Sequence, residues 1–289
     1  MSSDGEIRHV SDTALWVAAF RAQEGRRPDA AFDDPLAALS GERGRAIARA
    51  VPRAEMVRWG VVVRTSAIDR LIHEALQSGV DMVVNLGAGL DARPYRMDLP
   101  ATLRWIEIDF PNIVEMKNSG LAAQQPACQL QRIGMDLLDC SALGKRLAEL
   151  ATGTKSILAI TEGVLSYFSA HQAAALAEEL RACAPLRFWI QDFDNAGQRR
   201  LPRGWQAKLK AAPFLFKVKD WFAFFERYGW RPHHAITCFE ESQRIKRPYP
   251  LDFPAGLILR ALPKTMSQRI LSLSGAVMMQ NVAFAGGQR

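Results

Sequence analysis

The chain has 289 residues, of which 48% are hydrophobic and 23% are charged, and its formal net charge at pH 7 is +7. This length suits one sizeable core, and we predict a single domain extended at its N-terminus. The four cysteines are widely spaced and form no CxxC pair or Cys/His cluster, so neither a disulfide framework nor a metal site is expected. The first residues lack the pattern of a signal peptide and no apolar run is long enough to span a membrane, so we expect a cytoplasmic protein.

Residues 1–79 are predicted to form a helical N-terminal cap. Helices are expected at 11–24 and 55–77, because apolar residues recur there at helical spacing. Between them we expect a loop that closes with Phe32-Asp33-Asp34-Pro35, a short helix and a break at 41–44. A plain dinucleotide-binding domain usually starts with its glycine-rich strand, so this extension argues against that class.

The centre of the sequence is an apolar run, Met82–Leu86, that ends in Gly87 and Gly89. The run has the length of a buried parallel strand, and glycine lets the backbone turn sharply and approach a ligand closely. A second strand-like run, 103–109, ends in the carboxylate of Asp109. A glycine turn after one strand and an acid at the tip of the next are typical of a site that holds a nucleoside cofactor.

Strands and helices then alternate at a regular spacing. Strands are predicted at 128–133, 156–161 and 187–192, with a helix between each pair, so we expect parallel βαβ units with right-handed crossovers. Because ligands bind beyond the carboxyl ends of parallel strands, the residues that follow the strands should share one crevice. We therefore predict a cofactor-binding core over 80–195, with these residues along one crevice: Gly87, Asp109, Asp136 and Glu162.

The C-terminal segment, 196–289, has a different pattern and is predicted to lie on the substrate side. An aromatic-rich helix is expected at 220–228, ending before Pro232, and strands are expected at 235–240 and 276–285. Two strands without a helix after them fit an antiparallel addition to the edge of the sheet. The predicted fold class is therefore α/β, a mostly parallel sheet with an antiparallel last strand and helices on both faces.

Several motifs in register resemble the leucine carboxyl methyltransferase family. They are Asn85 to Arg93, Ile106 to Pro111, Phe32 to Pro35, the helix that carries Arg64, and Thr161 to Tyr167. The resemblance covers roughly residues 12–195 and is far more specific than the glycine turn alone. It implies a class I methyltransferase fold, with a Rossmann-like seven-stranded sheet, and S-adenosylmethionine as the cofactor.

This family contains the enzyme that methylates the C-terminal leucine of a protein phosphatase, and bacterial relatives that act on polyketides and other small molecules. The resemblance therefore implies an S-adenosylmethionine-dependent O-methyltransferase that modifies a carboxylate or a hydroxyl of a small molecule. It also implies roles for single residues. Gly87, with Ala88 and Gly89, should lie against the methionine part of the cofactor, and Arg64 should pair with the cofactor carboxylate.

The remaining implied roles fall on the strands after the glycine turn. Asp109, next to Phe110, should hold the ribose hydroxyls, and Asp136 and Leu137 should flank the adenine. Glu162 should lie near the reacting methyl group, and the candidate catalytic residues are Glu162 and Tyr167. Asp91 and Arg93 are expected to shape the loop rather than to bind the ligand.

The choice of acceptor depends on whether a general base is present. A carboxylate is already ionised at neutral pH, whereas a phenol would be helped by a base. The five histidines lie outside the family motifs, which favours a carboxylate. A basic cluster at 199–219 is compatible with an anionic small-molecule acceptor. We expect neither a nucleic-acid nor a membrane partner, and the oligomeric state is left open.

Two alternatives from other classes stay open. Gly87 to Ala92 also fits the G-x-G-x-x-G/A pattern of nicotinamide-dependent oxidoreductases. The cluster at 199–219 interleaves cationic with aromatic residues, as surfaces that bind nucleic acids do. The second alternative is therefore a non-catalytic or nucleic-acid-binding protein on the same fold.

Overall fold

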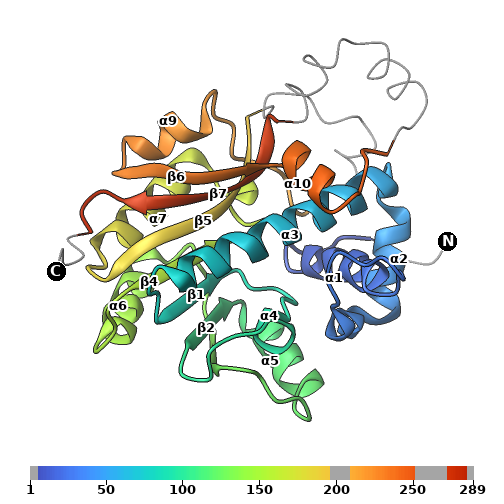
Figure 1. Cartoon of the computed structure of the whole chain (residues 1–289), viewed down its shortest axis with the longest axis horizontal. Coiled ribbons are helices and arrows are strands. Elements are labelled where there is room, and N and C mark those ends of the chain that lie inside the picture. The colour runs from blue at the N-terminus through green and yellow to red at the C-terminus, as the bar shows by residue number, and fades with distance from the viewer. Residues whose placement is uncertain (1–5, 196–208, 251–271, 285–289) are drawn as a thin grey trace.

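The computed structural model describes residues 6–195, 209–250 and 272–284. Within these residues seven strands form one sheet in the order β3-β2-β1-β4-β5-β7-β6, with helices on both faces (Figure 1). The strands are β1 (Met82–Leu86), β2 (Arg104–Asp109), β3 (Gln129–Gly134), β4 (Ile157–Thr161), β5 (Leu186–Asp194), β6 (Trp230–Thr237) and β7 (Ser274–Asn281). The helices are α1 (Asp12–Glu24), η2 (Pro35–Ser40), α2 (Gly41–Ala50), α3 (Ala54–Gln77), α4 (Arg93–Arg96), α5 (Pro111–Gly120), α6 (Cys140–Ala151), η3 (Leu165–Tyr167), α7 (Ala170–Ala182), α9 (Trp221–Glu226) and α10 (Cys238–Arg244).

The sheet is parallel from β3 through β2, β1 and β4 to β5. β7 is antiparallel to both of its neighbours, β5 and β6. Since β7 follows β6 in the chain but lies between β5 and β6, β6 becomes the edge strand. The predicted fold class, a mostly parallel sheet with an antiparallel last strand, is therefore confirmed.

Each face of the sheet is covered by its own apolar layer. Alternate residues of a strand point to opposite faces, so Val83 of β1 packs on one face and Val84 on the other. α3 covers the Val83 face, and α6, α7 and α9 cover the Val84 face (Figure 1). Because both faces are covered, β1 and β4 are buried along their whole length, as is usual for central parallel strands.

A third apolar cluster joins the N-terminal helices to the carboxyl end of β1. It contains residues of α1 and α2 and reaches the start of α3 through Val57 and Val61. Leu90, from the loop after β1, belongs to the same cluster. The N-terminal helices therefore lie against the carboxyl ends of the parallel strands. In the described part of the chain, no helix is long and apolar enough to cross a membrane.

The break predicted at 41–44 is confirmed only at Gly41, whose φ of +60° separates η2 from α2, and it is wrong at Gly44, because α2 continues through that residue. A Cβ on Gly44 would lie 2.7 Å from the carbonyl oxygen of Leu15 and 2.6 Å from the Cβ of Ser40. Gly44 therefore allows α2 to approach α1 closely, which is a packing role of glycine rather than a turning one.

The strand predicted at 235–240 is also misplaced, since β6 begins at Trp230 and ends at Thr237, and α10 follows it. Pro232 is tolerated inside β6 because an edge strand has a free side and the register shifts at this proline. The strand changes to helix at Thr237, whose side chain opens a capping box.

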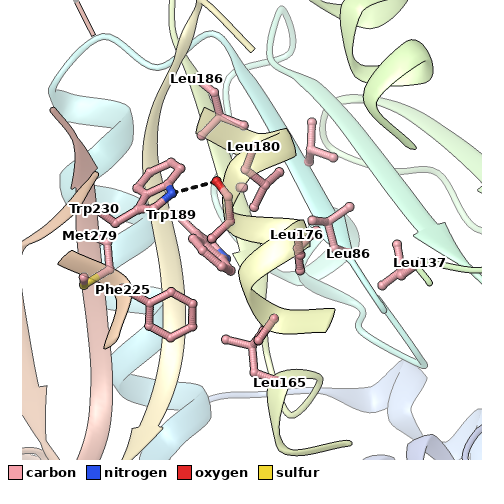
Figure 2. Packing of buried hydrophobic residues seen from close by; sticks show 14 of the residues in the cluster. Leu86, Leu137, Leu165, Leu176, Leu180, Leu186, Trp189, Phe225, Trp230 and Met279 are labelled. Carbon is pink, nitrogen blue, oxygen red and sulfur yellow. Dashed lines mark hydrogen bonds between the residues drawn. The ribbon is translucent and has the colours of Figure 1, made fainter. Parts of the chain in front are cut away.

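Trp230 ties the edge strand to the helices behind the sheet (Figure 2). Its ring packs edge-on against Trp189 of β5, with ring centroids 5.3 Å apart. Its indole Nε1 donates a hydrogen bond of 3.0 Å to the carbonyl oxygen of Ala177 in α7. The side chain is fully buried, so its ring fills space in the core and its single N–H donor has a partner there.

Shortening Trp230 should destabilise the fold in two steps. Trp230→Phe should lower the free energy of unfolding by about 1–3 kcal/mol, because the buried hydrogen bond from the indole to the carbonyl of Ala177 is lost. Trp230→Ala should lower it by about 3–5 kcal/mol, because a large cavity remains. Urea unfolding followed by circular dichroism measures both, with Leu138→Ala, at an exposed position, as the control. Losses no larger than that of the control would contradict this role of Trp230.

Candidate active site

A cavity of about 650 Å³ lies at the carboxyl ends of the parallel strands. Its wall is completed by α1, the first half of α3 and residues 211–215. Every residue predicted to bind the cofactor or to act in catalysis lines this cavity: Arg64, Gly87, Ala88, Gly89, Asp109, Phe110, Asp136, Leu137, Glu162 and Tyr167. The structure thus brings together all of these side chains and turns. Among the described residues, no group of three or more His, Cys, Asp or Glu could hold a metal ion.

The glycine turn after β1 depends on two residues in the left-handed region. Gly87 has φ +69° and Gly89 has φ +49°, values that side chains with a Cβ rarely adopt. A Cβ on Gly87 would lie only 2.4 Å from Cγ2 of Val164, which follows β4. The turn after β1 and the turn after β4 therefore approach each other closely, and only glycine fits between them.

Asp109 holds the glycine turn at the end of β2. One carboxylate oxygen, Oδ2, accepts a hydrogen bond of 2.6 Å from the backbone N–H of Gly89. The other, Oδ1, accepts one of 2.7 Å from the N–H of Phe110. Burial raises the pKa of the Asp109 carboxyl, and these two backbone hydrogen bonds partly offset that shift. Asp136, after β3, similarly accepts a bond of 3.0 Å from the N–H of Leu138.

Glu162 lies at the centre of a partly buried ion cluster. Its Oε1 is 3.1 Å from Nε of Arg64, and its Oε2 is 2.8 Å from Nη1 of Arg93. Arg64 also reaches Asp192 of β5, with 3.0 Å between Nη1 and Oδ2. Burial alone would raise the pKa of the Glu162 carboxyl, but the charges of Arg93 and Arg64, with that of Arg21, lower it to about 2.

Three members of this cluster were not predicted as site residues. Arg93 was expected only to shape the loop, yet it contacts Glu162 as well as Asp91 at 2.8 Å. Asp192 pairs with Arg64, and its position at the carboxyl end of a predicted strand was the signal that could have identified it. Arg21 of α1 pairs with Asp34 at 2.9 Å and donates a hydrogen bond to the carbonyl of Leu90. No local sequence pattern singles out Arg21.

Tyr167 closes the cavity on the side of the N-terminal helices. Its ring packs against Phe214, with ring centroids 5.3 Å apart. Burial raises the pKa of its phenol, although hydrogen bonding with Thr13 and the charge of Arg64 partly counter the shift. Tyr167 therefore keeps its proton at neutral pH.

The basic cluster predicted near the substrate is only partly described. Residues 199–208 lie outside the described residues. Lys210, Lys217 and Lys219 are described and exposed, and they do not line the cavity. This part of the cluster therefore faces solvent, and it gives no support to the expectation of an anionic acceptor.

A profile of the leucine carboxyl methyltransferase family matches residues 14–181. The chain belongs to this family. A protein of Parafrankia sp. (strain EAN1pec) is 31% identical, with 87% of this chain and 86% of that protein covered. A protein of Mycobacterium sp. (strain KMS) is 34% identical, with 88% and 93% covered. Both are named S-adenosyl-L-methionine-dependent methyltransferases.

Solved structures confirm the class I, Rossmann-like methyltransferase fold. A methyltransferase from Thermobifida fusca YX aligns with a TM-score of 0.53 at 12% identity, over 83% of this chain and 89% of that one. A DUF574 family protein from Streptomyces avermitilis aligns with a TM-score of 0.52 at 13% identity, over 91% and 96%. The family and the relatives named above show that the chain is an S-adenosylmethionine-dependent methyltransferase, which argues against the oxidoreductase alternative.

The charges around the cavity suit this cofactor. S-adenosylmethionine carries a sulfonium and an ammonium group against one carboxylate, so it is cationic overall. The described lining contains two guanidinium groups, those of Arg21 and Arg64, and six carboxylates: Asp91, Asp109, Asp136, Glu162, Asp192 and Asp194. The excess of carboxylates complements a cation, and the glycine turn leaves backbone open to the ligand.

The ion-paired Glu162 carboxylate should make the free energy of unfolding fall as the pH becomes acidic. Its pKa of about 2 lies below the ordinary value of 4.5, so its contribution is complete above pH 4.5 and is lost as the pH falls toward 2. The difference between these two pKa values corresponds to about 3 kcal/mol of unfolding free energy, of which about 2 kcal/mol should be lost between roughly pH 6 and pH 3.

Glu162→Gln should not show this part of the loss of stability at low pH, because glutamine does not titrate. Urea unfolding at a series of pH values measures the free energy of unfolding of each variant. Glu149→Gln, at an exposed ion pair with Arg146, is the matched control and should keep the wild-type slope. A Glu162→Gln variant with the wild-type slope would show that Glu162 is not an ionised, paired group in the folded chain.

Proposed function

We propose that this methyltransferase transfers the methyl group to a carboxylate oxygen of a small molecule. The observation that carries the proposal is that no histidine lines the cavity and that Glu162, the acid expected near the reacting methyl group, is held in ion pairs. None of the five histidines in the chain lines the cavity. Glu162 is an ion-paired carboxylate with a pKa of about 2, which makes it a poor proton acceptor at neutral pH.

A carboxylate acceptor needs no general base, since its pKa of about 4 leaves it ionised at neutral pH. A hydroxyl acceptor would have to lose a proton during the reaction. Tyr167, the other predicted catalytic residue, keeps its own proton because burial raises the pKa of its phenol. It can donate a hydrogen bond to an acceptor oxygen but cannot take a proton from one. The carboxylate is therefore the better fit of the two predicted acceptors.

We assign the cofactor's amino acid end to the ion cluster. A guanidinium has five N–H donors, and the ion pairs of Arg64 use its Nε and Nη1. Nη2 can therefore donate hydrogen bonds to the cofactor carboxylate, as the family resemblance implies. Glu162 would accept a hydrogen bond from the ammonium group, and the pairing with Arg93 keeps Glu162 ionised and fixed for that task.

We assign the nucleoside end to the residues after β1, β2 and β3. Each oxygen of Asp109 accepts one backbone hydrogen bond and keeps a lone pair for a ribose hydroxyl. Asp136 would offer a polar contact to the adenine, and Leu137, which is almost fully buried, would cover a face of the ring. Gly87 would lie against the methionine part of the cofactor, where a Cβ would obstruct the site.

Methyl transfer to a carboxylate requires the protein to bind and position the reactants rather than to transfer protons. When bound, S-adenosylmethionine supplies a methyl group on a positively charged sulfur, which an oxygen nucleophile can take by direct displacement. The residues described here would bind the two reactants in line, exclude water and hold the charged groups in place. Glu162 is already ionised and paired, so it need not change protonation state during the transfer.

Replacing Asp109 should weaken cofactor binding. Asp109→Ala should reduce the affinity for S-adenosylhomocysteine by about 1–3 kcal/mol, because charge-assisted hydrogen bonds are lost. Gly87→Val should abolish binding, because the new side chain meets Val164 in a backbone conformation that valine avoids. Isothermal titration calorimetry measures both affinities. The control is Asp139→Ala, which removes a carboxylate that caps α6 outside the cavity and should bind like wild type. Wild-type affinity in all three variants would place the cofactor elsewhere.

The acceptor type is tested by the stability of the product. We expect methyl transfer from labelled S-adenosylmethionine to a panel of carboxylic acids, and the labelled products should release methanol in mild alkali. Phenols and alcohols of matched size form the second arm of the panel. A wild-type enzyme that labels only hydroxyl compounds, in products that resist alkali, would refute the carboxylate proposal.

A further inference from the structure

Gly60 lies inside α3, where glycine destabilises a helix relative to alanine. Other described glycines have a structural reason, either a φ in the left-handed region or a close neighbour. Among the described glycines, Gly60 alone has neither, since its φ is not positive and a Cβ placed on it would meet no atom of the described residues within 4 Å. Neither its backbone conformation nor packing against the described residues explains a glycine at this position.

The place of Gly60 in the cavity offers the explanation. It lines the cavity one helical turn before Arg64, on the same face of α3 as Val57 and Val61. One turn displaces a residue by about 5.4 Å along the helix. Gly60 is therefore offset from the ion cluster around Glu162, toward the N-terminal end of α3. A side chain there would extend into open cavity space.

This end of the cavity is apolar. The side chains of Val57 and Val61 belong to the same apolar cluster as Val17 of α1 and Phe214. The two arginines of the described lining are already paired, Arg21 with Asp34 and Arg64 with Glu162 and Asp192. Within the described residues, this end therefore offers contact area to an apolar group and no free cation to a second anionic one.

We propose that Gly60 is a specificity-determining residue, whose missing side chain opens the cavity to the apolar body of a bulky monocarboxylic acid. The inference rests on the proposed function, because it assumes that the reacting group is a carboxylate held near the ion cluster. It adds that the rest of the acceptor is apolar and lies against Val57, Val61 and Phe214.

The test fills the space without touching the ion cluster. The probe is 1-anilinonaphthalene-8-sulfonate, a bulky aromatic monoanion, titrated by fluorescence into protein saturated with S-adenosylhomocysteine. Gly60→Phe should weaken probe binding by about tenfold or more, and Gly60→Ala should change it by less than about threefold. Both variants should bind S-adenosylhomocysteine with an affinity within about twofold of wild type, as measured by calorimetry.

His73→Phe is the matched control, because it adds the same ring on an exposed face of α3, away from the cavity. It should bind the probe at least as well as wild type. Equal probe binding by wild type and Gly60→Phe, or no probe binding by the wild-type complex, would overturn the inference. So would a parallel loss of S-adenosylhomocysteine affinity in Gly60→Phe, since that would assign Gly60 to the cofactor. The alkali test on the wild-type product does not involve residue 60, so the proposed function and this inference can fail separately.

Discussion

One ion-paired carboxylate, that of Glu162, fixes the geometry on which the rest of the site depends. It is shared by Arg64 from the long helix α3 and Arg93 from the short helix α4, while Arg64 also reaches Asp192 on β5. Charges taken out of water must be paired, and removing one partner leaves the others uncompensated. The cluster therefore holds α3, α4 and the ends of β4 and β5 in one relative position, at the edge of the sheet where the cavity lies.

The same cluster constrains the chemistry that the cavity can support. Glu162 and Asp192 form ion pairs with Arg64, and none of the five histidines lines the cavity. The pKa of Glu162 is lowered to about 2, so this carboxylate is a fixed charge rather than a group that titrates near neutrality. Fixed charges suit a reaction in which both reactants already carry the charge they need. An ionised carboxylate and a sulfonium meet that condition, because neither has to exchange a proton with the protein.

The sequence predicts the fold well because its signals are local. Buried strands such as Met82–Leu86 end at glycine turns or at acids, and this pattern predicted the core and lining residues such as Gly87, Asp109 and Glu162. Other lining residues, Arg64 and Tyr167 among them, were implied only by the family resemblance. The errors arise where a tertiary contact decides. Gly44 looks like a helix breaker but sits where two helices touch, and Pro232 looks like a strand breaker but lies on an edge strand. Arg21 and its partner Asp34 lie in the N-terminal region, and only the folded chain brings them to Leu90.

The strand order also sets when this site can exist during folding. β6 precedes β7 in the chain but touches the sheet only through β7, which pairs with β5 so that Ala276 faces Asp192. Ser274 and Gly275 of β7 themselves line the cavity. On a ribosome, the five parallel strands can associate early, but β5 must keep an open edge and β6 must stay unpaired until β7 has been synthesised. The cavity is therefore completed only after β7 has been synthesised, and an exposed strand edge next to it persists until then.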